Sequence, residues 1–211
     1  MTLTEMLFDL NIRVTAEATA LLEQLADELL RWNRSRNLTA ITARAEVMEK
    51  HLVDSLTLLP FARQAERLLD VGSGAGFPAL PLKIACPELD VVAVDAVGKK
   101  IDFQRHVTRA LKLEGFTALH GRVEILQEQS GYRAGFDLVT ARALCGLTEL
   151  LRLTEPFLAP GGRLVAMKGP EGCQEYAALY APLQREGWTL ALHKLCLPVS
   201  KAERCLIELR R

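Results

Sequence analysis

The chain has 211 residues, of which 49% are hydrophobic and 25% charged, so it suits one folded domain with an appended segment rather than a disordered or fibrous protein. Lys and Arg number 26, as do Asp and Glu, so any nucleic-acid surface must be a local patch. The five scattered cysteines, none spaced CxxC, argue against a disulfide framework or a metal site and favour a reducing cytoplasm. We expect no membrane span and no signal peptide, because no apolar run is long enough and the start is acidic and amphipathic.

The first elements expected along the chain are helices. Thr15 can cap a helix whose apolar residues recur at helical spacing as far as Trp32. A second helix is expected over Ala45 to Leu59, ended by Pro60. Because these helices precede every predicted strand, residues 1–62 are expected to form a helical extension that lies against a later sheet.

From Arg67 onward, strand patterns alternate with helical patterns, which predicts a parallel sheet with helices on both faces. The last two strands are joined by a link too short for a helical crossover, so this pair should be antiparallel. Residues 63–211 are therefore expected to form a Rossmann-like α/β domain, with a doubly wound, mostly parallel seven-stranded sheet that ends in an antiparallel hairpin. The predicted strands are Leu68–Val71, Val91–Val94, Ala118–His120, Asp137–Thr140, Arg163–Lys168, Thr189–Lys194 and Cys205–Leu209, and the predicted helices between them are Ala79–Ala85, Lys99–Leu113, Leu147–Leu158 and Gln174–Glu186.

A glycine-rich turn, DVGSGAGF from Asp70 to Phe77, follows the first of these strands. In such sheets, ligands bind beyond the carboxyl ends of the strands, and glycines let the backbone turn sharply and approach a ligand closely. The glycines are Gly72, Gly74 and Gly76, whereas a dinucleotide fingerprint, G-x-G-x-x-G, would place glycine where Phe77 stands. The pattern therefore disfavours a nicotinamide cofactor.

Two acidic residues point to S-adenosylmethionine as the cofactor. Asp70 precedes the glycines, as expected of a carboxylate near the positive sulfonium and amino groups of that molecule. Asp95 ends the second predicted strand, where a carboxylate can accept hydrogen bonds from both ribose hydroxyls. The alternative is a purely conformational glycine turn with two capping acids.

The segment after the fourth predicted strand faces the transferred methyl group in this fold, and here it reads TARAL from Thr140 to Leu144. It contains no Asn/Asp-Pro-Pro-aromatic tetrapeptide, which adenine amino methylation usually requires. Cys86 lies on the wrong element to be a nucleophile, and Cys145 has no neighbour that would lower its pKa. A ring nitrogen with a free lone pair, such as guanine N7, remains as an acceptor that needs only placement in line with the methyl group.

Basic residues follow the second predicted strand, namely Lys99, Lys100, Arg105, Arg109 and Lys112. The last three are expected on one stripe of a helix, which is either a solvated face or part of a phosphate-binding rim. Arg142 and Lys168 stand at the carboxyl ends of two strands, and their positions favour the second interpretation, a phosphate-binding rim.

Taken together, the sequence resembles the bacterial 16S ribosomal RNA guanine-N7 methyltransferases, also called the glucose-inhibited division protein B family. The motifs that carry the resemblance are W-N-x3-N-L-T-A-I (Trp32 to Ile41), H-L-V-D-S-L (His51 to Leu56), D-V-G-S-G-A-G-F-P (Asp70 to Pro78), D-A-V-G-K-K (Asp95 to Lys100), R-V-E (Arg122 to Glu124), A-R-A (Ala141 to Ala143) and K-G (Lys168-Gly169). The resemblance implies the class I S-adenosylmethionine-dependent methyltransferase fold, and 7-methylguanosine in the decoding-region loop of small-subunit RNA as the product. It also implies 16S ribosomal RNA or the small subunit as partner, and we expect a monomer.

Carried over position by position, the resemblance implies that Gly72 and Phe77 line the cofactor pocket and that Val123 and Glu124 flank the adenine. Arg142 should stand beside both cofactor and incoming base, as a catalytic residue that orients rather than removes a proton. Ala79 departs from the expected glycine after the Phe-Pro pair.

The polar residues of the N-terminal motifs, Asn37, Thr39, His51, Asp54 and Ser55, either line the mouth of the active site or only brace the helices. Asn37 and His51 are expected to contact RNA in the first case. Three other interpretations stay open: a small-molecule methyltransferase, an NAD-dependent oxidoreductase and a non-catalytic RNA-binding module.

Overall fold

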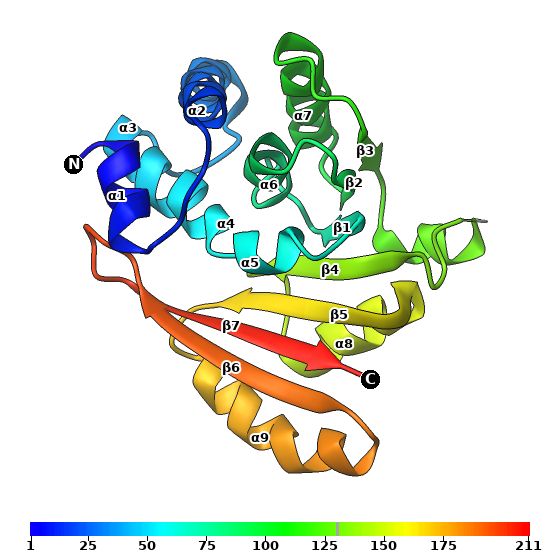
Figure 1. Ribbon diagram of the computed structural model, residues 1–211. Helices are drawn as coiled ribbons and strands as arrows, with labels where there is room; N and C mark the ends of the chain where they lie inside the picture. Colours follow the sequence, from blue (N-terminus) through cyan, green and yellow to red (C-terminus); the bar gives the residue numbers. More distant parts are fainter. Residues whose placement is uncertain (130) are drawn as a thin grey trace.

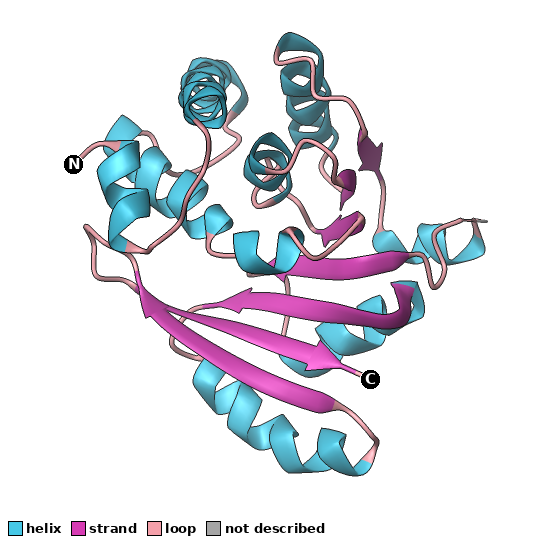
Figure 2. Cartoon of the chain, viewed as in Figure 1, coloured by secondary structure: helices cyan, strands magenta, loops and turns pink. Residues whose placement is uncertain are grey.

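The computed structural model describes residues 1–129 and 131–211, which form a seven-stranded sheet with helices on both faces (Figures 1 and 2). The strand order across the sheet is β3-β2-β1-β4-β5-β7-β6, and β7 runs in the direction opposite to the other six strands. The mostly parallel sheet and its antiparallel terminal hairpin are thus confirmed. The strands are β1 (Arg67–Val71), β2 (Asp90–Asp95), β3 (Phe116–His120), β4 (Phe136–Arg142), β5 (Leu158–Lys168), β6 (Thr189–Cys196) and β7 (Glu203–Arg210).

The helices divide between the two faces of the sheet because successive side chains on each strand point to opposite faces. Leu68 packs with α5 and α6 on one face, and Leu69 packs with α8 and α9 on the other. The helices are α1 (Leu3–Asp9), α2 (Ala16–Arg36), α3 (Arg44–Val47), the π-helical turn Met48–Val53, α4 (Asp54–Leu56), α5 (Leu59–Ala62), α6 (Ala79–Ala85), α7 (Gly98–Ala110), α8 (Leu147–Thr154) and α9 (Gly172–Arg185), with 3-10 turns at Val123–Glu128 and Glu155–Phe157. No helix in these described ranges is both long and apolar enough to span a membrane.

The N-terminal helices differ in part from the expectation. Thr15 caps α2 as predicted, since its hydroxyl accepts a hydrogen bond from the Ala18 amide at 3.1 Å. The single helix expected over Ala45 to Leu59 is wrong, because α3, a π-helical turn, α4 and α5 take its place. Pro60 does not end a helix but lies in the first turn of α5, where its missing amide hydrogen is not needed.

Three other predicted elements also need corrected boundaries. The helix expected over Lys99–Leu113 is α7, which ends at Ala110, and Lys112 has a left-handed backbone with φ of 52°. Lys112 is therefore not part of a helical stripe. β5 begins five residues earlier than the predicted Arg163, and α8 gives way to a 3-10 turn before it.

The helical extension is fastened to the far end of the sheet through Glu49 in the π-helical turn. This side chain is only 3% exposed, and its Oε1 accepts hydrogen bonds from the amides of Val199 and Ser200, at 2.7 and 2.8 Å. Those two residues belong to the turn between β6 and β7, which lies beside the N-terminal helices at the left of Figure 1. One buried carboxylate therefore joins segments 150 residues apart.

We predict that Glu49→Ala lowers the free energy of unfolding by about 1–3 kcal/mol, because two charge-assisted hydrogen bonds are lost at a buried position. Denaturant unfolding of Glu46→Ala provides the control, since Glu46 lies on the same segment but is exposed. Equal stability of the two variants would contradict a fastening role for Glu49.

Candidate active site

Two adjoining cavities lie at the carboxyl ends of β1, β2 and β4. The larger, of about 540 Å³, is bounded by the glycine turn on one side and by the N-terminal helices on the other. The smaller, of about 250 Å³, adjoins the 3-10 turn after β3. Both are lined by Gly72, Asp95 and Leu144, so one extended ligand can occupy the two together. This is the region where the strand order reverses, as expected for a doubly wound sheet.

Each glycine of the turn has its own reason to be glycine, and all three have positive φ. A Cβ on Gly72 would lie 2.6 Å from Cδ1 of Leu144, and one on Gly76 would lie 2.4 Å from Cδ1 of Leu80, so these two permit close packing. A Cβ on Gly74 would meet only the Lys100 ammonium, at 4.0 Å. Gly74 therefore leaves open space into which a ligand can approach the backbone.

The turn is held by Gln104 on α7, which the sequence analysis did not single out. Its amide nitrogen donates to Oγ of Ser73 at 2.8 Å and to the carbonyl of Gly74 at 2.7 Å, and the side chain is fully buried. A glutamine on the otherwise apolar face of α7 is the pattern that could have revealed it.

The Asp95 carboxylate lies where the two cavities meet. Its Oδ2 accepts a hydrogen bond from the Gly74 amide and its Oδ1 accepts one from the Val97 amide, both at 2.8 Å. Each oxygen keeps a second lone pair, so the carboxylate can still accept hydrogen bonds from a diol. Val123 and Glu124 line the smaller cavity beside it, as do the backbone segments around Ala96.

Asp70 lies elsewhere than the sequence analysis expected. It is fully buried and lines neither cavity, and its Oδ2 accepts a hydrogen bond from the Ala79 amide at 3.2 Å, at the start of α6. Burial raises the pKa of this carboxyl to about 7. Oδ1 has no partner among the described residues. Asp70 therefore supports the turn from beneath, and Gly76 likewise lines neither cavity.

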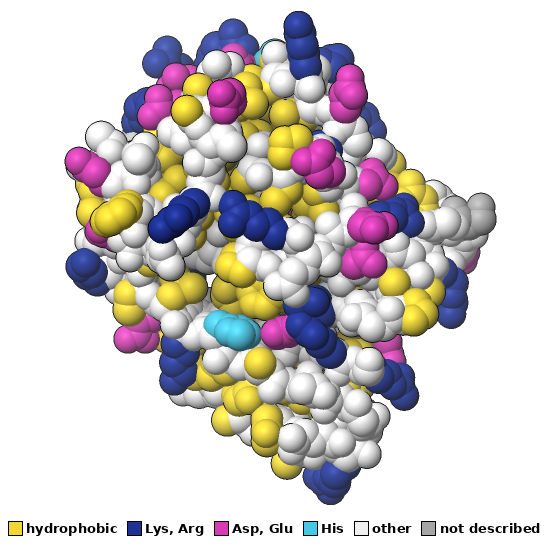
Figure 3. All heavy atoms as spheres, viewed as in Figure 1, with side chains coloured by type: hydrophobic (Ala, Val, Ile, Leu, Met, Phe, Trp, Pro, Cys, Tyr) yellow, Lys and Arg dark blue, Asp and Glu magenta, His cyan; other side chains and the backbone are white. Residues whose placement is uncertain are grey.

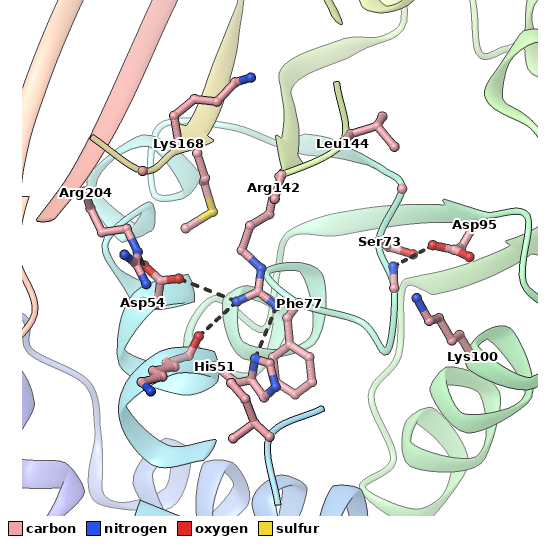
Figure 4. Close-up of a pocket in the computed structure, with 17 residues that line it drawn as sticks. His51, Asp54, Ser73, Phe77, Asp95, Lys100, Arg142, Leu144, Lys168 and Arg204 are labelled. Carbon is pink, nitrogen blue, oxygen red and sulfur yellow. Dashed lines mark hydrogen bonds and ion pairs between the residues drawn. The ribbon is translucent and has the colours of Figure 1, made fainter. Parts of the chain in front are cut away.

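Arg142, at the end of β4, lines the larger cavity, and its side chain extends toward His51 and Asp54 (Figure 4). Its Nη1 donates to the Lys50 carbonyl at 3.0 Å and lies 3.5 Å from Oδ2 of Asp54. Oδ1 of Asp54 accepts a hydrogen bond from Nε of Arg204 on β7, at 2.9 Å. Burial lowers the pKa of the Arg142 guanidinium and raises that of Asp54, and the ion pairs oppose both shifts. One buried carboxylate thus bridges two guanidinium groups.

His51 completes this arrangement. Its Nδ1 lies 3.2 Å from Nη2 of Arg142, and a guanidinium can only donate, so Nδ1 accepts and the imidazole proton is on Nε2. Nε2 then donates to Oγ1 of Thr39, at 3.0 Å. Burial and the neighbouring Arg142 lower the pKa of His51 to about 3, so the ring is neutral. The ring stacks on Phe77, with centroids 4.7 Å apart.

The Trp32 to Ile41 motif positions Thr39 for this contact. Oδ1 of Asn33 accepts hydrogen bonds from the amides of Leu38 and Thr39, at 2.7 and 3.0 Å, and its Nδ2 donates to the Thr39 carbonyl at 2.9 Å. Asn37 is exposed and has a left-handed backbone that ends α2, so it lies outside the cavity. Of the N-terminal polar residues, His51 and Asp54 line the mouth, whereas Asn37 does not.

The predicted basic residues separate into three groups. Lys100 lines the larger cavity, and the exposed Lys99 precedes it in the first turn of α7. Arg105 donates from Nε and Nη2 to the Ala118 carbonyl, at 3.2 and 3.0 Å, so it is tied to β3. Arg109 and Lys112 are exposed and line neither cavity.

Lys168 is engaged within the protein. It is 8% exposed, and its ammonium donates to the Cys145 carbonyl at 2.5 Å and to both carboxylate oxygens of Glu175, at 3.0 and 3.1 Å. Glu175 also accepts a hydrogen bond from the Leu147 amide, at 2.5 Å. Lys168 therefore braces the loop after β4. Lys168 nevertheless lines the larger cavity. Arg204 and Lys50 also line it but were not among the predicted site residues, because nothing in their local sequence marks them.

These two cavities fit S-adenosylmethionine. The open space above Gly74, the diol-accepting Asp95 carboxylate and the apolar wall at Val123 match the cofactor's adenosine part. The larger cavity continues from there toward Arg142. The part of the chain that the structure describes contains no cluster of three or more His, Cys, Asp or Glu residues suited to a metal ion.

Solved structures share this architecture. An O-methyltransferase from Bacillus cereus, in complex with SAH, superposes with a TM-score of 0.63 over 89% of this chain and 91% of that chain, at 13% identity. A putative O-methyltransferase from Klebsiella pneumoniae gives a TM-score of 0.61 over 88% and 89%, at 14% identity. The protein therefore has the class I S-adenosylmethionine-dependent methyltransferase fold.

The sequence defines the family within that class. The family model described as rRNA small subunit methyltransferase G, GidB, matches residues 18–201. Proteins named Ribosomal RNA small subunit methyltransferase G are 52% identical over 88% of this chain and 85% of the relative in Syntrophotalea carbinolica, and 44% identical over 96% and 93% in Geobacter sp. strain M21. The chain belongs to this family and is an S-adenosylmethionine-dependent methyltransferase, as the resemblance indicated.

We predict that Asp95→Ala weakens binding of S-adenosylhomocysteine by about 1–3 kcal/mol, because the ribose hydroxyls lose a charged acceptor. Titration calorimetry measures the affinity, and Asp102→Ala, an exposed carboxylate on α7, is the control. Wild-type affinity in a folded Asp95→Ala variant would exclude Asp95 from the cofactor site.

A second prediction concerns pH. The unfolded chain protonates His51 near pH 6.5 but the folded chain only near pH 3, so stability from this group is present above pH 6.5 and is lost as the pH falls toward 3. Between pH 7 and pH 5 the loss should be about 2 kcal/mol. His51→Gln should show a shallower decline in unfolding free energy over this range, whereas the exposed control His120→Gln should follow the wild type. If the unfolding free energy of His51→Gln fell as steeply as that of the wild type, the His51 ring would not be buried in its neutral form.

Proposed function

We propose that this protein transfers a methyl group from S-adenosylmethionine to N7 of a guanine in the decoding-region loop of 16S ribosomal RNA. The family named above supports the RNA class, and the resemblance drawn from the sequence motifs supports the guanine and its ring nitrogen. The proposed setting is the cytoplasm, and the proposed acting form is a monomer. In this proposal residues 63–211 hold the cofactor and residues 1–62 form the wall that faces the RNA.

The proposal rests on one observation, namely that the acidic and basic groups of the larger cavity are not free to remove a proton from an acceptor. Of the two carboxylates that line it, Asp54 is paired with Arg142 and Arg204, and Asp95 would be taken up by the cofactor's ribose. The Nδ1 lone pair of His51 is held by Arg142. The cavity thus favours an acceptor that needs no proton removed before it reacts. Guanine N7 is such an acceptor, because its lone pair is free.

The bound cofactor supplies a methyl group made electrophilic by its sulfonium, so the protein's part is to orient the acceptor and exclude water. Three N–H groups of Arg142 face Lys50, Asp54 and His51, which leaves its Nε–H and one Nη2–H without a partner among the described residues. A donor to guanine O6 would orient the base and leave N7 free. We assign that role to Arg142.

The charge of the cavity supports a polyanionic substrate. Five cations line it against two carboxylates, namely Lys50, Lys100, Arg142, Lys168 and Arg204. Lys and Arg side chains, with Asp and Glu among them, also lie along the edge over α2 and α7 (Figure 3). We propose Lys99 and Lys100 as the RNA-facing residues nearest the cavity, and His51 as a residue that acts on the RNA side through Arg142, because both of its ring nitrogens are engaged. Because Arg105 and Lys168 are bonded within the protein, we propose only a secondary role for them, with Asn37, Arg109 and Lys112 at the periphery.

Methyl transfer from labelled cofactor onto small ribosomal subunits from cells that lack the enzyme tests the proposal. Nucleoside analysis should find the label in 7-methylguanosine of 16S RNA. Label in any other nucleoside would overturn the acceptor. Binding of RNA without transfer would favour a non-catalytic module, and transfer to small molecules alone would favour a small-molecule methyltransferase.

We predict that Arg142→Lys lowers turnover at least tenfold, because an ammonium keeps the charge but loses the planar fork that spans three partners and the base. Affinity for S-adenosylhomocysteine should fall much less. Arg109→Lys, an exposed residue of α7, is the matched control. If Arg142 only braces the N-terminal helices, the melting temperature should fall while turnover of the folded protein stays near the wild-type value.

A further inference from the structure

Three of the five cysteines meet in one small pocket beside the β6–β7 hairpin. Cys173 comes from the first turn of α9, Cys196 from the end of β6 and Cys205 from β7, and together they line a cavity of about 280 Å³. In the hairpin, Lys194 pairs with Cys205 and Cys196 pairs with Glu203, so both hairpin cysteines are on the face of the sheet that α9 covers. None of the three lines the two cavities of the methyltransferase site.

Two of these thiols are in direct contact. Sγ of Cys173 and Sγ of Cys205 are 2.9 Å apart, within hydrogen-bonding distance. Gly172 allows this approach, because a Cβ at that position would lie 2.5 Å from Cβ of Lys168 and 3.2 Å from Cβ of Cys205. α9 can therefore lie close enough to the sheet to place Cys173 against Cys205.

The pair is suited to covalent linkage. A disulfide needs the sulfur atoms about 2.05 Å apart, so each sulfur has to move by less than 1 Å. Cys173 is half-buried and can be reached from solvent, whereas Cys205 is only 2% exposed. Burial, with the hydrogen bond to Cys173, raises the pKa of Cys205 to about 11, which makes it the second rather than the first thiol to react.

We propose that Cys173 and Cys205 form a thiol modification site, which a low-molecular-weight disulfide such as oxidised glutathione converts into an intrachain disulfide. The Cys173 thiolate attacks one sulfur of the glutathione disulfide, so a mixed disulfide forms and one glutathione thiolate leaves. Cys205 gives its proton to solvent and its thiolate attacks Sγ of Cys173, which releases the second glutathione. One external disulfide is reduced to two thiols, and the protein loses two hydrogens.

The bond would tether two elements that support the active site. Cys173 is two residues from Glu175, which holds Lys168, and Cys205 follows Arg204, which holds Asp54. Linking α9 to β7 across a 32-residue separation restricts the unfolded chain, so the oxidised protein should be the more stable form.

The experiment uses the full-length reduced protein treated with oxidised glutathione. The intact mass should fall by about 2 Da, peptide mapping should recover Cys173 joined to Cys205, and the melting temperature should rise by about 5–10 °C and return after reduction. Cys173→Ser and Cys205→Ala should lose both the mass change and the rise. Cys86→Ser, which removes a thiol from outside the pocket, should keep both.

A stable glutathione adduct without a Cys173–Cys205 bond, a bond that uses Cys196 in place of either residue, or no reaction at all would overturn the proposal. Cys205→Ala changes a buried position and can fail to fold. In that case the result for Cys173→Ser, which changes the half-buried member of the pair, settles the test by itself. Because none of these measurements uses methyl transfer, the result is independent of the proposed function.

Discussion

The arrangement of the active site depends on one buried carboxylate. Asp54 is 3% exposed, and a carboxylate withdrawn from water at such a position is destabilising unless charged partners surround it. Its partners are Arg142 at the end of β4 and Arg204 at the start of β7, so three segments far apart in the chain must meet at one point. The N-terminal helices are consequently held over the carboxyl edge of the sheet, opposite the glycine turn, and the larger cavity is the space between them.

The same constraint sets the charge of the cavity. Two guanidinium groups share one carboxylate, so a positive charge is left over next to the space where the acceptor would lie. A protonated His51 would add a further charge against Arg142 and near a cationic methyl donor. Burial and Arg142 keep the ring neutral instead, and a neutral ring can accept from the guanidinium while stacking on Phe77. The cavity therefore attracts phosphate without strongly repelling the cofactor.

The sheet and the cofactor turn could be predicted because their information is local. Alternating apolar residues mark the strands, and Asp95 is the last residue of the strand that positions it. The partners of the buried polar groups could not be predicted from the sequence. Arg204 and Asp54, for example, are 150 residues apart, and no periodicity connects them. The π-helical turn around His51 was missed for a similar reason. The segment has an ordinary helical pattern, and its partners Val199, Ser200 and Arg142 are all distant in sequence.

The glycine motif and the N-terminal motifs carry different kinds of information. Two of the three glycines are needed for packing against Leu144 and Leu80, requirements that any sheet of this type can impose, so the motif alone points to the fold more than to the reaction. The Trp32 to Ile41 and His51 to Leu56 motifs instead build a chain from Asn33 through Thr39 and His51 to Arg142. That chain reaches the larger cavity at His51 and Arg142, on the side opposite the glycine turn. The N-terminal motifs therefore fix the position of the His51 ring and the Arg142 guanidinium, a requirement that the cofactor turn alone does not impose.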